Sequence, residues 1–279
     1  MTLGRMKTVD KVLLYLAVAS ACLLIGFPVY WMLITSLQDQ ARLLTLPPAF
    51  LAVPPRVEGY AAVVKEFPIW TWMVNSLVVA LASTAFSVLF SILSGYSLSR
   101  FKYAGNGIFG LLILVTQMLP ATLIIIPLYI MFAGLKLLDT FWGLIIANST
   151  FSLPLCTWTL KGFFDSLPKE LEEAAVVDGC NTLGVLFKVM LPLAAPAVVA
   201  VAVISFFAAW DEYMFANTFI SDPAKWVGTM GLAAFKGEMY TPWDRVMAGA
   251  FIFTLPAIVF FLVLQRYIVS GLTVGAVKG

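Results

Sequence analysis

The segment at residues 173–192 reads EAAVVDGCNTLGVLFKVMLP, and it stands between two long apolar stretches in the second half of the chain. Charged side chains gather in this segment and just ahead of it, namely Asp165, Glu170, Glu172, Glu173, Asp178, Lys161, Lys169 and Lys188. Charges at this density need water or partners of opposite sign. The pattern therefore predicts a hydrophilic loop, residues 161–192, that links two apolar parts of the fold.

Proline, glycine and asparagine divide this loop into two short helices. Pro168 suits the first turn of a helix, where its missing N–H group costs nothing, and Gly179 supplies the stop. Asn181 or Thr182 can cap a second helix that ends before Pro192, because the proline ring disfavours continuation. Two interpretations are open for the pair: a solvated amphipathic loop, or a docking surface for another protein.

The composition places the rest of the chain in a membrane. Of the 279 residues, 61% are hydrophobic and 11% are charged, with a mean hydropathy of +0.96. A soluble fold of this size could not bury so much apolar surface. We predict a single all-α integral membrane domain, residues 1–279. Its six blocks each reach the ~20 residues that a helix needs to cross the hydrocarbon, and they are 12–37, 73–98, 108–132, 141–160, 193–219 and 246–268.

Basic residues orient these spans. Arg5, Lys7 and Lys11 precede the first span, and such flanks stay on the cytoplasmic side. Both termini and the 161–192 loop are then cytoplasmic. Residues 38–71 form an extended, proline-rich outer loop. This outer loop either contacts an extracytoplasmic partner or folds as a lid over the helix ends.

Several classes of function are disfavoured by residue types. The net charge is only +2 without a basic cluster, so nucleic acid is not an expected partner. His is absent, and Cys22, Cys156 and Cys180 are far apart, which argues against a metal site or a disulfide framework. The chain has no Gly-x-x-x-x-Gly-Lys-Ser/Thr motif, so we expect it to bind neither ATP nor another cofactor itself.

A stripe of small residues marks the second predicted span. Ser83, Ser87, Ser91 and Gly95 are spaced four apart, which places them on one face of a helix. Small side chains let helices approach closely, so the stripe indicates a packing seam. A polar lining of a transport path would show the same pattern, and this alternative stays open.

The 173–192 segment resembles the signature loop of the membrane subunits of bacterial ABC importers. The matching residues are Glu173, Ala174, Ala175, Gly179, Leu191 and Pro192, and Val189 stands where that family usually has Ile. The resemblance implies a pair of coupling helices that seat in a cleft of a cytoplasmic ATPase subunit. Glu173 would form a salt bridge or cap in that cleft, Ala174 and Ala175 would allow close approach, and Gly179 would permit the turn. Asp178 belongs to the same expected site.

Further polar residues are candidates for a substrate path. Gln117 and Asn148 lie in the third and fourth spans beside prolines, which bend helices and free backbone carbonyls. Trp210, Asp211 and Tyr213 lie near the outer end of the fifth span. Carboxylates there would accept hydrogen bonds from sugar hydroxyls, and an aromatic ring would stack on a pyranose. The alternative is that Asp211 and its neighbour Glu212 form an interfacial pair in headgroup water.

The sequence Trp210-Asp211-Glu212-Tyr213 is similar to the Trp-Asn-Glu-Phe/Tyr segment of the carbohydrate-uptake branch of these permeases, with Asp211 in place of Asn. Other stretches that fit this branch are 75–77, 96–101, 118–120, 126–129 and 271–279. The resemblance to the smaller permease subunit of maltose-type importers implies a bacterial inner-membrane complex. Its partners would be a second permease, two ATPase subunits that hold ATP and Mg, an extracytoplasmic sugar-binding protein and membrane lipid.

Rival functions are less compatible with the residues. A permease for a phosphorylated polyol would call for basic residues along the path, and the spans hold almost none. A secondary transporter would show inverted repeats and an ionisable residue near the midplane. A membrane-embedded enzyme would need a nucleophile, a metal or a proton-transfer set.

Overall fold

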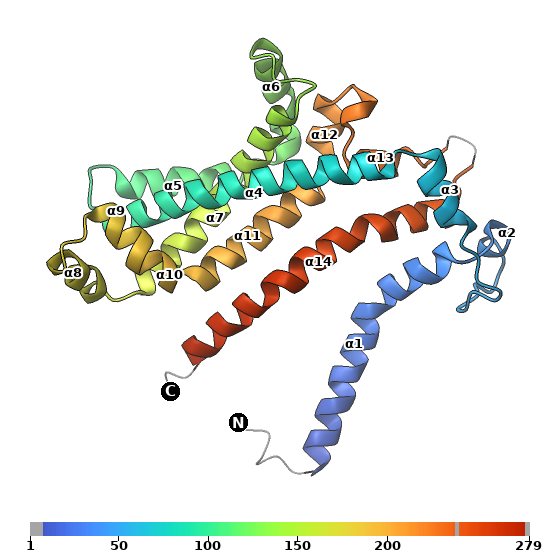
Figure 1. Cartoon of the computed structure of the whole chain (residues 1–279), viewed down its shortest axis with the longest axis horizontal. Coiled ribbons are helices and arrows are strands. Elements are labelled where there is room, and N and C mark those ends of the chain that lie inside the picture. The colour runs from blue at the N-terminus through green and yellow to red at the C-terminus, as the bar shows by residue number, and fades with distance from the viewer. Residues whose placement is uncertain (1–7, 238–239, 277–279) are drawn as a thin grey trace. The chain divides into compact units, whose positions relative to one another are not determined.

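The computed structural model describes residues 8–237 and 240–276, with side chains placed for 9–237 and 240–265. The basic residues Arg5 and Lys7 and the tail at 277–279 lie outside the described residues. In the described part, helices joined by loops account for the fold (Figure 1). The helices are α1 Thr8–Ser36, α2 Gln40–Leu43, α3 Glu58–Glu66, α4 Ile69–Arg100, α5 Asn106–Thr116, α6 Ala121–Gly134, α7 Phe141–Ser166, α8 Glu170–Val177, α9 Thr182–Val185, the π-helical segment η2 Leu186–Met190, α10 Leu191–Leu193, α11 Ala195–Trp210, α12 Met214–Phe219, the 3-10 segment η3 Pro223–Lys225, α13 Gly228–Ala233 and α14 Trp243–Ala276.

The chain divides into two compact units. The first unit consists of Met1–Ile69 and Leu232–Thr254, and the second of Trp70–Gly231 and Leu255–Gly279. In the first unit, the apolar side chains of α1 are exposed along most of the helix. A helix that is apolar and uncovered over this length is stable only where lipid or a partner protein covers it.

The proline-rich loop of the first unit, residues 38–68, is more ordered than the extended chain that its prolines predict. The side chain of Asp39 accepts a hydrogen bond from the backbone of Ala41 and caps α2, and its other oxygen lies 2.7 Å from Arg56. The helix α3 forms in the stretch between the prolines, and Glu66 at its end pairs with Arg245 at 2.6 Å. As predicted, no helix of spanning length lies between Ser36 and Ile69. The stretch is nevertheless not extended throughout, because the prolines interrupt only the segments that flank α3.

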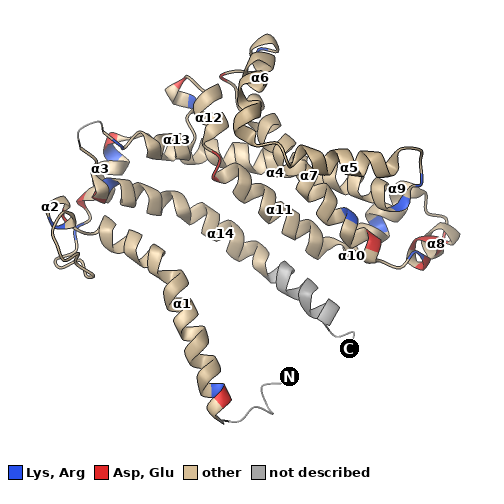
Figure 2. Ribbon diagram, turned by 180° about the vertical axis from the view of Figure 1, so that it is seen from behind, with Lys and Arg blue, Asp and Glu red and all other residues tan. Residues whose placement is uncertain are grey.

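The second unit is built around α7 and α11, which pack along each other. One apolar cluster, which includes Phe164, Met190 and Val201, lies beneath α8–α10. A second cluster, which includes Phe132 and Phe219, lies beneath α6 and α12. Charged residues of this unit gather near α8–α10 and in the loops next to α6 and α12, while the helices between them are nearly free of charge (Figure 2).

The small-residue stripe of α4 is buried, as the packing interpretation expects. Ser83, Ser87 and Ser91 are fully covered. A Cβ atom on Gly95 would lie 3.1 Å from the backbone oxygen of Thr157 and from the backbone nitrogen of Lys161, so α4 and α7 are close to backbone contact there. The stripe therefore joins α4 to α7 as one packed pair.

A larger residue at Gly95 should destabilise this pair. For Gly95→Leu we expect a loss of about 1–3 kcal/mol, because the added atoms meet backbone that cannot rotate away. Thermal unfolding of the purified chain in detergent would measure the loss. Gly162→Leu is the matched control, since a side chain at Gly162 on α7 would meet open space. Equal melting temperatures for the two variants would contradict the packing seam.

Two predicted spans are broken rather than continuous. The α5–α6 pair bends by 100° between Thr116 and Ala121, and α11 makes an 80° angle with the helical segment that ends at Leu193. The fifth span is interrupted again between Trp210 and Met214. Pro120 stands at the N-cap of α6, where a residue without an N–H group is tolerated but cannot continue α5. The bend within 108–132 agrees with the expectation that prolines bend the third span, while the segment 193–219 is less regular than one continuous helix.

By length and composition, three helices are suited to cross a membrane: Val9–Ser36, Ile69–Arg100 and Trp243–Gln265. The two bent pairs raise this number to five if each counts as one span. The helix α7 is long but carries Asn148, Ser149, Thr150 and Ser152, which lower its hydropathy. The chain is thus a multi-pass helical membrane protein.

Candidate coupling site and substrate path

The two ends of α8 are stabilised by local interactions, with acidic residues in its first turn and a glycine turn after its last residue. Three glutamates, at 170, 172 and 173, lie in its first turn, where negative charge is stabilised by the helix dipole. At its end the N–H of Cys180 donates to the carbonyl of Ala175, and the N–H of Gly179 to that of Val176, each at 3.0 Å. Gly179 has a φ of +85°. These bonds define a Schellman motif, whose left-handed position favours glycine.

The second helical segment starts as predicted and ends later. The side chain of Asn181 accepts a hydrogen bond of 2.8 Å from the backbone of Gly184 and caps α9. The prediction that the helix stops before Pro192 is wrong, because α10 runs through it to Leu193. The N–H of Leu191 bonds to the carbonyl of Leu186, five residues back, in the π-helical segment just before Pro192. This wider turn relieves the clash that a proline ring causes in a regular α-helix.

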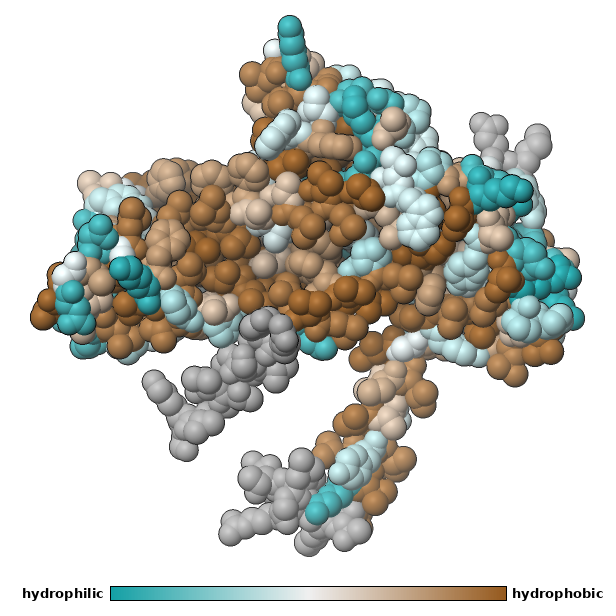
Figure 3. Space-filling view, in the orientation of Figure 1, coloured by the Kyte–Doolittle hydropathy of each residue, from teal (hydrophilic) through white to brown (hydrophobic). Residues whose placement is uncertain are grey.

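The α8–α9 turn buries one side and exposes an apolar tip. Ala175 is 6% exposed and belongs to the apolar cluster under α8–α10, so its small side chain fits packing inside this chain. Ala174 and Glu173 are exposed. Val177 is 87% exposed and Leu183 60%, and hydrophobic surface stands between hydrophilic patches at this end of the unit (Figure 3). Exposed apolar residues with a polar rim are typical of protein–protein contact sites.

The remaining residues of the predicted coupling site lie at the end of α8 and in α10. Asp178 is exposed at the C-cap of α8, Pro192 is exposed, and Leu191 is half-buried at the start of α10. The structure therefore leaves Glu173, Ala174 and Asp178, which lie between the first turn and the C-cap of α8, exposed. Leu183 and Val177, which sequence matching passed over, supply the apolar part of this surface.

Three of the five predicted substrate-path residues are exposed and two are buried. Gln117 is exposed at the end of α5 and donates to the carbonyl of Phe151 at 3.2 Å. Asp211 and Tyr213 are exposed in the interruption between α11 and α12. Asn148 is 5% exposed, inside α7. An apolar cavity of about 230 Å³ adjoins Gln117.

Trp210 does not present its ring for stacking on a sugar. Its side chain is 3% exposed, and its ring lies parallel to that of Phe206 with 5.5 Å between centroids. Phe206 in turn stacks on Phe260 at 3.7 Å. The interpretation of Trp210 as a sugar-stacking residue does not fit this conformation. Its ring is buried in a stack with Phe206 and Phe260 and is not accessible to a sugar.

Glu212 has a structural role that sequence reasoning missed. Its carboxylate accepts hydrogen bonds from the backbone N–H groups of Phe215 at 2.6 Å and Ala216 at 3.0 Å. Its backbone carbonyl accepts a bond of 2.7 Å from the hydroxyl of Thr229. Glu212 thus caps α12 as an N-terminal acceptor does. A carboxylate directly before a short helix was the signal in the sequence.

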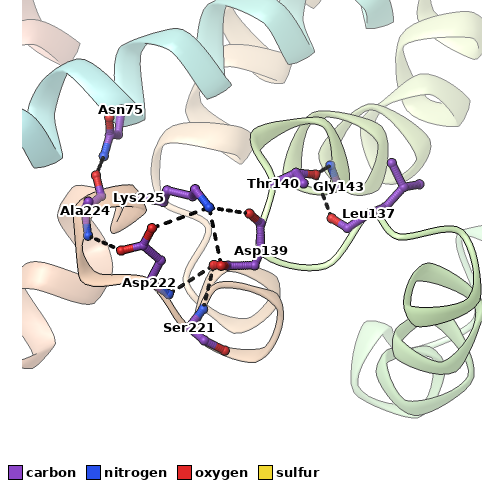
Figure 4. Close-up of polar contacts among 9 residues, drawn as sticks. All are labelled: Asn75, Leu137, Asp139, Thr140, Gly143, Ser221, Asp222, Ala224 and Lys225. Atoms are coloured by element: carbon purple, nitrogen blue, oxygen red, sulfur yellow. Dashed lines mark hydrogen bonds and ion pairs between the residues drawn. The ribbon is translucent and has the colours of Figure 1, made fainter.

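A polar network fastens the loops that precede α7 and follow α12. The carboxylate of Asp139 accepts from the backbone of Ser221 at 3.1 Å and of Asp222 at 3.0 Å, and lies 3.3 Å from the ammonium of Lys225 (Figure 4). Asn75 of α4 donates to the carbonyl groups of Ala224 at 3.0 Å and Trp226 at 2.8 Å. The network holds two loops and α4 together at this end.

Acid should weaken this network. The backbone N–H of Asp222, followed by that of Ser221 and by Lys225, holds the pKa of Asp139 below its ordinary value of 3.8. A depressed pKa contributes stability above the ordinary value, and this stability is lost as the pH falls through the depressed one. Asp139→Asn should therefore melt below the wild type at neutral pH, by an amount that shrinks below pH 3.8. Melting curves of both proteins from neutral to acid pH would show this, with Asp10→Asn on α1 as a control. A gap that does not change with pH would contradict it.

These features define a class: a multi-pass helical membrane protein that presents a charged helix–turn–helix with an apolar tip. Residues 87–274 match the family described as binding-protein-dependent transport system inner membrane component. The chain belongs to this family of ABC importer permeases, as its signature loop predicts. It is a membrane subunit and not a catalytic enzyme, and the ATPase of such importers is on separate subunits.

Relatives cover nearly all of the chain. The sulfoquinovosyl glycerol transport system permease protein SmoH of Agrobacterium fabrum is 35% identical over 94% of this chain and 93% of its own. The trehalose/maltose transport system permease protein MalG of Thermococcus litoralis is 32% identical over 99% of both chains. A crystal structure of a bacterial ABC transporter involved in import of the acidic polysaccharide alginate matches with a TM-score of 0.78 at 23% identity. It covers 96% of this chain and 99% of that one, which shows the shared fold.

Proposed function

We propose that this chain forms half of the translocation path of a sugar importer in a bacterial inner membrane. The observation that carries the proposal is the apolar tip at Val177, which stands exposed on a charged helical turn and needs a partner to cover it. The substrates for which the relatives are named support a sugar: sulfoquinovosyl glycerol, trehalose or maltose, diacetylchitobiose and arabinooligosaccharides. The partners would be a second permease, two ATPase subunits and an extracytoplasmic binding protein.

The spans of this proposal number six. They are α1, α4, the α5–α6 pair, α7, α10 with α11, and α14, and both termini are cytoplasmic. The basic residues before the first span support this orientation. The polar residues Asn148 and Ser152 are tolerated in a span because they are buried inside the protein. The α8–α10 segment then faces the cytoplasm and the ATPase subunits.

The transport mechanism would be alternating access. ATP and Mg are held by the partner subunits, whose closure pushes α8, and hydrolysis reverses the movement. Because Ala175 and the residues beneath it pack α8 on the core of the second unit, displacement of α8 is passed on to helices rather than absorbed by a loop. The spans then alternate between two arrangements that the nucleotide state favours in turn.

The polar edge of the path would consist of Gln117, Asp211 and Tyr213. Their amide, carboxylate and phenol groups are exposed and can exchange hydrogen bonds with sugar hydroxyls. The Tyr213 ring is 43% exposed, so it is available for stacking, unlike that of Trp210. The second permease would line the facing side.

Transport by the reconstituted complex tests this function. The chain would be placed in proteoliposomes with its three kinds of partner, and uptake of labelled oligosaccharides would be measured with and without ATP and binding protein. We expect uptake that requires both. Uptake driven by an ion gradient in the absence of ATP would contradict the proposal and favour a secondary transporter.

A further inference from the structure

Arg100, the last residue of α4, is tied to the coupling helix over a long separation in sequence. Its guanidinium Nε forms an ion pair with Glu172 of α8, and Nη2 donates to the carbonyl of Leu167 at 2.9 Å. The hydroxyl of Tyr96 donates to the second carboxylate oxygen of Glu172 at 3.0 Å. The group thus joins α4, the link between α7 and α8, and α8 itself.

This cluster is more shielded from water than the other ion pairs of the described residues. The side chains of Arg100 and Glu172 are 7% and 17% exposed. The neighbouring pair of Lys161 and Asp165, both on α7, is 24% and 43% exposed. Asp165 accepts a hydrogen bond of 2.6 Å from Ser99 of α4, and within the described residues the pair forms no hydrogen bond or ion pair with α8. Two charges removed from water are stable only when both are well paired, so separation of Arg100 from Glu172 would be strongly unfavourable.

The geometry favours a rigid joint. Arg100 is at the negative end of α4 and Glu172 at the positive end of α8, so each charge is also favoured by its own helix. The planar guanidinium makes bonds in two directions at once, which a flexible ammonium does less well. The Tyr96 ring is held edge-on against Phe164 at 5.6 Å, which aims its hydroxyl at Glu172.

Resting on the proposed coupling role of α8, we propose that Arg100 is a positioning residue that makes α4 move together with the coupling helix. The chain itself joins α8 only to α7 and α9. Through Arg100 and Glu172, displacement of α8 by a partner also reaches the C-terminal end of α4, whose buried stripe packs on α7. Displacement of α8 therefore moves both α7 and α4. The ion pair then determines how many sugars are transported per ATP hydrolysed.

The test is the number of sugars transported per ATP hydrolysed by the reconstituted complex. For Arg100→Gln and Glu172→Gln we expect this ratio to fall about tenfold while the ATPase subunits remain bound and active. Arg100→Lys keeps the charge but loses the second bond, so its ratio should lie between those of Arg100→Gln and the wild type. Tyr96→Phe, which keeps the ion pair and the ring, should lower the ratio by about two- to threefold.

Matched controls separate this inference from a general loss of stability. Lys161→Gln removes the exposed neighbouring pair and should leave the ratio unchanged. A wild-type ratio in Arg100→Gln and Tyr96→Phe, or an equal fall in Lys161→Gln, would overturn the inference and leave the proposed function intact. Failure of the wild-type complex to link ATP hydrolysis to uptake would instead contradict the proposed function.

Discussion

Replacing Val177 by Asp should abolish binding of the ATPase subunits while leaving this chain folded. Val177 is 87% exposed, so a carboxylate there costs little in the free chain. In a complex the same carboxylate would be desolvated in an apolar contact, and a central contact residue of this kind contributes about 2 kcal/mol or more, which is at least about thirtyfold in affinity. Co-purification and titration of the ATPase subunits in detergent would measure the loss.

A matched control for this substitution lies on the proline-rich loop of the first unit. Val57 is 65% exposed, so Val57→Asp makes the same chemical change at a surface that the proposal does not assign to the ATPase. The control should bind the ATPase subunits as the wild type does. Equal binding by Val177→Asp and Val57→Asp would rule out the α8 tip as the docking surface.

Replacing Gly179 by Val should separate ATP hydrolysis from sugar uptake. A β-branched residue at a φ of +85° is strained, at a cost of about 1–2 kcal/mol or more, and the cost is relieved by loss of the Schellman end of α8. A Cβ atom at this position has no other atom of this chain within 4 Å, so within the chain the strain lies in the backbone. We expect uptake to fall about tenfold or more while hydrolysis by the complex continues.

Two variants isolate this backbone effect. Gly179→Asn should retain most of the uptake, because Asn tolerates the left-handed conformation better than Val. Gly162→Val adds the same side chain on α7 in open space and without a positive φ, and it should transport normally. Equal uptake by the Asn and Val variants at position 179 would contradict a role for the left-handed turn.

Local signals in the sequence were sufficient to predict the helical turn of the coupling site. Gly179 ends α8 and Asn181 caps the next helix, as their residue types indicate. The course of the chain through Pro192 was not predictable, because it depends on a π-helical segment that no residue pattern announces. Helix ends that depend on one residue type, such as glycine or asparagine, can thus be predicted from the sequence. An end that depends on a shift in the backbone hydrogen-bond register cannot.

Hydropathy predicted the apolar blocks but not their shape. The blocks at 108–132 and 193–219 are apolar throughout, yet the chain bends by 100° and 80° within or beside them. Apolar composition indicates that a segment is buried in lipid or protein, but it does not indicate where the helix axis bends. The same limit explains Trp210, whose burial against Phe206 depends on neighbours distant in sequence.

Long-range pairing was also beyond the sequence. No pattern in the sequence pairs Arg100 with Glu172, which is one of several acidic residues in the 161–192 loop. Their ion pair depends on the packing of α4 on α7, which brings together residues far apart in the chain. Ala175 is a similar case, since its motif suggested contact with a partner and the fold places it in the chain's own core.

Photo-crosslinking from position 177 tests the coupling site most directly. A photoreactive amino acid would replace Val177 in the complex within native membranes, and Leu111, which is 59% exposed on α5, would be replaced in a parallel control. The account predicts a covalent adduct with an ATPase subunit from position 177 and none from position 111. An assembled, active complex in which position 177 reacts with lipid or water alone would contradict it.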